Sequence, residues 1–179
     1  MKLYKRFAVA LLAGIMVLAL FTACSSTPPQ SPEEQKKIDK ACMIWLDKAC
    51  RVVDRELPWN PQLRKAAQER GEELAATGEL ITNGVYWGRL DMEVPAGMEA
   101  DFMVLTWDKQ TAAAYDLDKL LDDAHHDAWA GDATQKMRDM MLHVLVTEKR
   151  LAEIEEADVA AIKNKDGTYS FVLGYIIAE

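Results

Sequence analysis

The sequence predicts an α+β fold in which helices cover both sides of a small antiparallel sheet, an α–β–α sandwich. Three observations lead to this fold class. A helix with clear start and stop signals lies within residues 57–79, an apolar stripe at helical spacing follows Ser31, and the chain ends in a hairpin over residues 159–177. The second hairpin strand is apolar on both faces, so it needs elements packed on each side, and the helices supply them.

Residues 1–23 have the pattern of a secretory signal. An uncharged apolar run over residues 7–21 leads to the small Ala23 before Cys24. The run is preceded by three basic residues, Lys2, Lys5 and Arg6. The ending resembles the cleavage box of bacterial lipoproteins, which implies that Cys24 becomes the acylated first residue; a plain signal peptide and an uncleaved anchor are the alternatives. By the same resemblance, Ser25 implies the outer membrane, with the protein facing the periplasm.

The remaining chain divides into a tether and one domain. Residues 24–31 are polar and contain prolines, which predicts a flexible tether, and residues 32–179 suffice for a single core. The whole chain has a net charge of −8, and removal of the three basic residues in the signal makes it −11. This acidity argues against nucleic acid as a partner and favours solubility or a basic partner.

The first helix of the domain is predicted to start after Ser31, with Pro32 in its first turn. Its apolar stripe contains Ile38, Ala41, Cys42, Trp45, Ala49, Val52 and Val53. Export to an oxidising compartment favours a disulfide between Cys42 and Cys50. On one continuous helix, however, the two residues are about 12 Å apart along the axis, whereas a disulfide needs Cα atoms within about 7 Å. We therefore expect two thiols, Cys42 in the core and Cys50 at its edge.

The second helix has the clearest boundaries in the sequence. Asn60 is a good N-cap, Pro61 suits the first turn, and Gly78 is placed to end the helix. One face carries Leu63, Ala66, Ala67, Leu74 and Ala75. We expect Leu63 and Leu74 to share one core with Phe171 of the C-terminal hairpin.

The middle of the chain is predicted with weaker signals. Residues 80–100 contain several glycines and a proline and are expected to form an ordered loop held by Tyr86, Trp87 and Met92. Residues 102–105 predict a short buried strand. Two helices are then expected, over residues 116–130 and 133–146, with Asp132 as the cap of the second. The final hairpin is predicted over residues 159–162 and 168–177, joined by an Asp-Gly turn.

The candidate binding residues are Asp118, Asp122 and His125, which share one flank of the helix predicted at 116–130. Carboxylates with an imidazole suit zinc or manganese, but a solvated helix face in an acidic protein has the same composition. His143 is expected at the edge of the core. The sequence contains no nucleophile elbow, phosphate-binding glycine loop or zinc-spaced cysteine set, so no catalytic residues and no cofactor are predicted.

The start of the second helix resembles the CAP superfamily, which includes cysteine-rich secretory proteins, plant PR-1 proteins and bacterial SCP-domain proteins. The family phrase Leu-x-Trp-Asn-x-x-Leu-x-x-Ala-Ala is matched here over residues 57–67. Residues 157–160 and 166–169 stand where the last strands of the family lie. Arg138, Met141 and Leu142 resemble a segment between these ends. The resemblance implies a CAP-like α–β–α sandwich for residues 32–179.

Many CAP proteins hold a divalent metal with two histidines and two acidic residues, and this chain departs from that pattern. Residues 79–83 lack the first histidine, Met137 (or Gln135) stands in place of the second, and Glu99 is followed by Ala100 rather than asparagine. No metal site is therefore carried over. The sequence favours a membrane-tethered, non-enzymatic domain that binds an envelope protein, lipid or cell-wall component; the alternative is a hydrolase or metal-dependent enzyme of unrecognised type.

Overall fold

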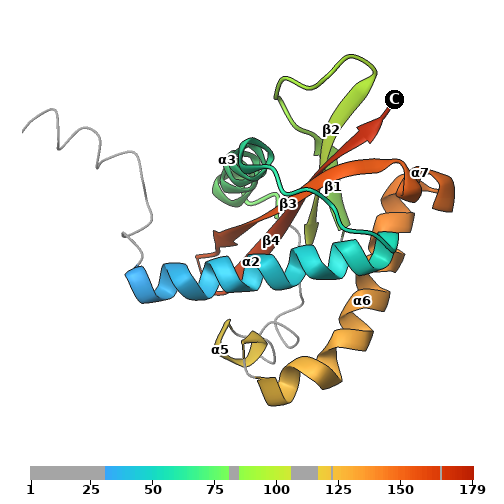
Figure 1. The fold of residues 1–179 in the computed structure, drawn as a ribbon. Coiled ribbons are helices and arrows are strands. Elements are labelled where there is room, and N and C mark those ends of the chain that lie inside the picture. The colour runs from blue at the N-terminus through green and yellow to red at the C-terminus, as the bar shows by residue number, and fades with distance from the viewer. Residues whose placement is uncertain (1–30, 81–84, 106–116, 122, 166) are drawn as a thin grey trace, which may run out of the picture. The chain divides into compact units, whose positions relative to one another are not determined.

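The computed structural model describes residues 31–80, 85–105, 117–121, 123–165 and 167–179 (Figure 1). The chain divides into two units, Met1–Ser31 and Pro32–Glu179, and the fold below is that of the second. Its elements are α2 (Pro32–Val53), α3 (Pro61–Thr77), β1 (Val85–Arg89), β2 (Met98–Leu105), α5 (Leu117–Leu120), α6 (Asp123–Leu145), α7 (Glu148–Ala152), β3 (Ile154–Lys163) and β4 (Tyr169–Ala178).

The strands form one four-stranded antiparallel sheet in the order β1-β2-β4-β3. The α+β class and the C-terminal hairpin are thus confirmed, with Lys163 paired to Tyr169 at the turn. β2 begins earlier than predicted and pairs with β4 from Met98 to Leu105. The expectation of an irregular loop over residues 80–100 is wrong in part, because residues 85–89 form an edge strand along β2.

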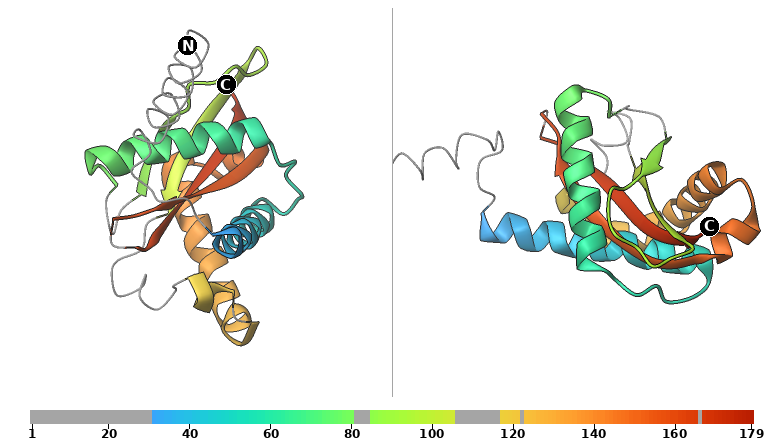
Figure 2. Two further views of the ribbon diagram at one scale, coloured as in Figure 1. Left: turned by 90° about the vertical axis from the view of Figure 1, so that its left-hand side faces the viewer. Right: turned by 90° about the horizontal axis from the view of Figure 1, so that it is seen from above.

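Helices pack on both faces of this sheet, because β4 presents buried side chains alternately to each side. Figure 2 shows α3 on the opposite side of the sheet from α2 and α6. We call the two sides the α3 face and the α2/α6 face. On β4, Val172 and Ile176 belong to the α3 face, and Phe171, Leu173, Tyr175 and Ile177 belong to the α2/α6 face.

The prediction of one shared core for Leu63, Leu74 and Phe171 is wrong. Leu63 and Leu74 are buried on the α3 face, whereas Phe171 is buried on the α2/α6 face, where its ring lies 5.6 Å from that of Trp45. The reason is the alternation of side chains along β4: the neighbour of Phe171, Val172, contacts the α3 side. The domain therefore has two hydrophobic cores with the sheet between them.

The two N-terminal helices follow their sequence signals. In α2 the predicted stripe is buried except for Val53, which is partly buried. Cys42 and Cys50 are both free, the first buried and the second partly buried, as expected. Lys48 is also fully buried on α2, which the stripe did not predict. For α3, Asn60 Oδ1 accepts from the N–H groups of Gln62 and Leu63, and Gly78 ends the helix with φ +77°. These boundaries are confirmed.

The predicted helices over 116–130 and 133–146 are placed wrongly. α5 ends at Leu120, and α6 runs without interruption from Asp123 to Leu145, through Gly131 and Asp132. Asp132 is therefore not an N-cap. Glycine inside a helix costs only about 1 kcal/mol relative to alanine, so packing of a long helix can override it. On the described part of α6, Met137, Met141 and Leu145 are buried against the α2/α6 face.

Candidate functional site

A group of charged side chains meets a buried tyrosine on the α2/α6 face, near the last residues of β4. We call it the Asp101 cluster; it consists of Arg89, Glu99, Asp101, Arg150 and Tyr175. In the sheet register, Asp101 on β2 stands between Arg89 on β1 and Tyr175 on β4. Residues two apart on a strand share a face, so Glu99 and Asp101 lie on the same side as the core residue Met103.

Two arginines, Arg89 and Arg150, make ion pairs and hydrogen bonds at the edges of the Asp101 cluster. Arg89 makes an ion pair with Glu99. Arg150, from α7, donates to Glu153 Oε2 at 2.9 Å and to the carbonyl oxygen of Ala178, the last residue of β4. Arg150 thus ties α7 to the end of β4 beside Asp101 and Tyr175.

Burial controls the electrostatics of the cluster. Burial raises the pKa of Asp101 above its ordinary value, and Glu99 adds to the shift, while Arg89 and Arg150 act in the opposite direction. Burial and then Asp101 raise the pKa of Tyr175, with Arg150 opposing them. Asp101 Oδ1 and the Tyr175 hydroxyl are buried, and neither has a hydrogen-bond partner within the part of the chain that the structure describes.

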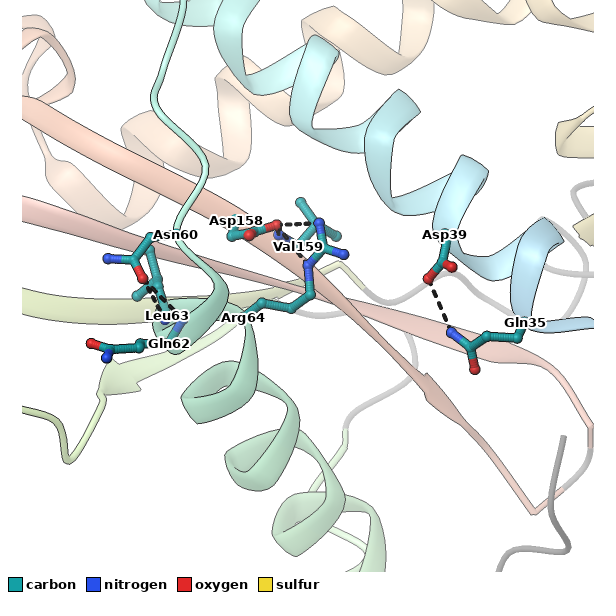
Figure 3. Close-up of polar contacts among 8 residues, drawn as sticks. All are labelled: Gln35, Asp39, Asn60, Gln62, Leu63, Arg64, Asp158 and Val159. Atoms are coloured by element: carbon teal, nitrogen blue, oxygen red, sulfur yellow. Dashed lines mark hydrogen bonds and ion pairs between the residues drawn. The ribbon is translucent and has the colours of Figure 1, made fainter. Parts of the chain in front are cut away.

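A second buried polar group joins α3 to the edge strand β3 (Figure 3). Arg64 on α3 donates to Asp158 Oδ1 from Nε at 2.9 Å and from Nη2 at 2.7 Å, and the N–H of Val159 donates to the same oxygen at 2.8 Å. Asp158 is fully buried. Close by, the N–H of Ala157 donates to the carbonyl oxygen of Pro58 at 3.2 Å. These contacts satisfy N–H groups on the free edge of β3, where an unpaired strand could otherwise join another chain.

The sequence-predicted binding residues do not form one described site. Asp118 lies in α5, is exposed and pairs with Lys37 of α2. Asp122 lies outside the described residues. His125 lies in α6, and its side chain is also outside the described part. The premise that all three lie on one continuous helix is wrong, because α5 and α6 are separate helices.

The positions compared with the CAP metal site contain other kinds of residue. Met137 is fully buried in the core of the α2/α6 face, and Glu99 is engaged by Arg89. Glu79 is exposed and accepts from the Tyr86 hydroxyl at 3.3 Å; residues 81–83 lie outside the described part. Within the described ranges, no group of three or more histidine, cysteine or acidic side chains is arranged to hold a metal ion.

The remaining candidates are the thiols and a histidine. Cys24 lies outside the described residues. Burial raises the pKa of Cys42 to about 12, so this thiol is unreactive at neutral pH. His143 is exposed on α6, and the expectation that it lies at the core edge is wrong. In the described ranges, no helix is both long and apolar enough to cross a membrane.

Sequence reasoning missed both the Asp101 cluster and the Arg64–Asp158 pair. A usable signal existed for the second, since Asp158 stands within the apolar run of residues 157–162 and a buried carboxylate needs a partner. For the first, only the register of β2 against β4 brings Asp101 and Tyr175 together. The chain matches no known family model, curated protein or solved structure.

Proposed function

We propose that this chain is a lipid-anchored, extracytoplasmic domain of the CAP-like type that binds a component of the cell envelope and has no enzymatic activity. The observation that carries the proposal is the N-terminal pattern: basic residues, an uncharged apolar run, and Ala23 before Cys24. Acylation of Cys24 would fix the protein to the outer membrane, facing the periplasm. Residues 24–31 would then hold the domain away from the bilayer.

The fold supports the CAP-like part of this proposal. The family implies helices on both sides of a small antiparallel sheet, and α3 packs on one face while α2 and α6 pack on the other. The matched phrase at residues 57–67 leads into α3, with Asn60 as the N-cap.

Metabolic labelling with a radioactive fatty acid tests the anchor. The full chain should be labelled and should fractionate with membranes, whereas Cys24→Ala should lose the label. Cys50→Ala is the matched control, because Cys50 is a partly buried thiol of α2 and its removal should leave labelling unchanged. A labelled, membrane-bound Cys24→Ala protein would contradict the proposal, as would an unprocessed wild-type chain without lipid.

The identity of the membrane is tested by one further substitution. By the lipoprotein resemblance, Ser25→Asp should retain the label and move the protein from the outer to the inner membrane. Density-gradient separation of the two membranes measures this shift. Wild-type protein in the inner membrane would contradict the outer-membrane location while leaving the lipid anchor intact.

A further inference from the structure

Trp59 stands at the junction of α2 and α3 and is 68% exposed. We propose that Trp59 is the centre of a docking surface for a positively charged segment of another envelope protein. This inference deepens the proposed function, on which it rests for the location of the partner. We define the Trp59 surface as Trp59 with the flanking side chains of Arg55, Glu56, Glu155 and Glu156.

The backbone on both sides of Trp59 is fixed. Before it, Leu57 is buried, its N–H donates to Cys50 Sγ at 3.3 Å, and the Pro58 carbonyl accepts from the N–H of Ala157 at 3.2 Å. After it, Asn60 caps α3 through its side-chain oxygen. An aromatic side chain on an already ordered backbone loses little freedom when a partner binds, so more of the contact energy appears as affinity.

Carboxylates lie on the two chain segments that meet at Trp59, the α2–α3 connection and the start of β3. Asn60 Nδ2 donates to Glu156 Oε2 at 2.7 Å, which places Glu156 beside the residue that follows Trp59. Glu155 precedes Glu156 on β3, and its Oε2 lies 3.9 Å from Arg55 Nη1. Glu56 is exposed in the connection between α2 and α3. The Trp59 surface thus has three carboxylates against one guanidinium, a net charge of −2.

These features together favour a cationic partner. The face of an indole ring attracts ammonium and guanidinium groups, and nearby carboxylates strengthen that attraction. The whole chain, at −8, adds a long-range attraction for basic segments. A neutral glycan could lie against the indole and donate hydroxyl hydrogen bonds to the carboxylates, but it would gain no charge attraction from them. An anionic lipid headgroup would be repelled by them.

Trp87 provides a matched comparison within the same chain. It is 57% exposed on β1, but Arg89 lies two residues further along the same strand face. Arg89 pairs with Glu99, so a positive charge offsets the carboxylate on this face of the sheet. Removal of Trp87 therefore controls for the general loss of one exposed tryptophan.

The test uses the full-length protein in a neutral detergent and a hexa-arginine peptide with blocked termini. Titration calorimetry at low salt should show binding, and Trp59→Ala should weaken it by about three- to fivefold. Trp59→Phe should retain part of the affinity, and Trp87→Ala should stay within about twofold of the parent. Glu156→Gln, which preserves an oxygen for Asn60, should weaken binding by about two- to threefold, as expected for one partly screened charge. A hexaglutamate peptide should not bind.

Several outcomes would overturn the inference. Equal affinities for the parent and Trp59→Ala would do so, as would equal losses in Trp59→Ala and Trp87→Ala. Binding of an N-acetylglucosamine hexasaccharide that depends on Trp59, without binding of hexa-arginine, would assign the surface to glycans instead. Melting curves check that the variants fold, which is expected because the side chain is exposed. Fatty-acid labelling tests the anchor at Cys24 and does not depend on Trp59. A failure of the docking inference can therefore be distinguished from a failure of the anchor proposal.

Discussion

The two faces of the sheet are packed with different kinds of residue. On the α3 face, small residues bring the helix close to the strands: a Cβ atom at Gly71 would lie 2.7 Å from Ile162 Cγ1, and one at Gly174 would lie 3.1 Å from Leu63 Cδ1. On the α2/α6 face, large and flexible side chains fill the core, including Trp45, Met103, Met137, Met141 and Phe171. At Gly71 and Gly174 the first face leaves little space for an added atom, whereas methionine side chains on the second face can adjust to changes around them.

Both sides of the sheet contain buried polar groups. On the α3 side, Asp158 Oδ1 accepts from Arg64 and from a backbone N–H, whereas Asp158 Oδ2 is buried without a partner among the described residues. On the α2/α6 side, Asp101 Oδ1 and the Tyr175 hydroxyl are buried without a partner among the described residues. The packing of the two faces indicates that the α3 face acts as the rigid part of the domain, and that the methionine-containing α2/α6 face has more packing freedom.

The largest expected effect comes from truncation of buried side chains on each face. Leu74→Ala should lower the free energy of unfolding by about 4 kcal/mol, because the close-packed α3 face cannot collapse into the cavity. Met141→Ala should cost nearer 2 kcal/mol, at the lower end for a buried methionine, because its methionine neighbours can move. Urea unfolding of both variants measures the difference. A larger loss for Met141→Ala would reverse the comparison.

A smaller effect is expected from one added methyl group. Gly71→Ala improves helix propensity by up to about 1 kcal/mol, but overpacking against Ile162 and Val172 should cost about 1–3 kcal/mol. The net result should be a loss of about 1 kcal/mol. The neighbouring Glu72→Ala, on the exposed side of α3, serves as the control and should be nearly neutral. A stabilised Gly71→Ala protein would show that the α3 face is less tightly packed than the contacts around Gly71 indicate.

A stabilising change is expected at the corner between α6 and α7. Val146 has φ +69° and is 81% exposed, a left-handed conformation that is strained for a β-branched residue. Val146→Gly should relieve this strain and raise the free energy of unfolding by about 0.5–1 kcal/mol. Asp54→Gly, at φ +56°, is the comparison and should gain less, because aspartate tolerates this conformation better. Thermal melting measures both, and a destabilised Val146→Gly protein would contradict the assignment of strain.

The smallest effect is a pH dependence on the α2/α6 face. The folded state raises the pKa of Asp101 above 3.8, so it binds this proton more tightly than the unfolded chain does. The contribution of Asp101 to stability should therefore fall as pH rises from 3.8 through the raised pKa. Asp101→Asn has no such titration, so its stability relative to the parent should increase over that interval and then level off. Urea unfolding from pH 3 to 7 tests the sign; an opposite trend would mean that the arginines outweigh burial.

Local signals predicted the parts of the fold that local contacts determine. α3 has a capping side chain, a first-turn proline and a left-handed glycine at its end, and its boundaries agree with Asn60 and Gly78. The uninterrupted course of α6 through Gly131 could not be predicted in this way, because packing overrides the weak preference of one glycine. The edge strand β1 was missed for a related reason: five residues become a strand here by pairing with β2.

The candidate sites were less accessible from the sequence because distant residues form them. Arg64 and Asp158 are 94 positions apart, and only the packing of α3 against β3 brings them together. Asp101 and Tyr175 meet through the sheet register. By contrast, the prediction that Asp118 and His125 share one helix flank required a single continuous helix. The chain instead forms two helices here, with Asp118 in α5 and His125 in α6.

Native-state hydrogen exchange tests the central claim most directly, namely that α3 and the sheet beneath it form the rigid part of the domain and that the α7 end of the α2/α6 face opens first. The amides of α3 should exchange only through global unfolding, because the helix is capped at both ends and closely packed. The amides of α7, a five-residue helix after the strained Val146, should exchange through local opening at much lower free energy. Equal protection of the two helices, or faster exchange in α3 than in α7, would contradict the account.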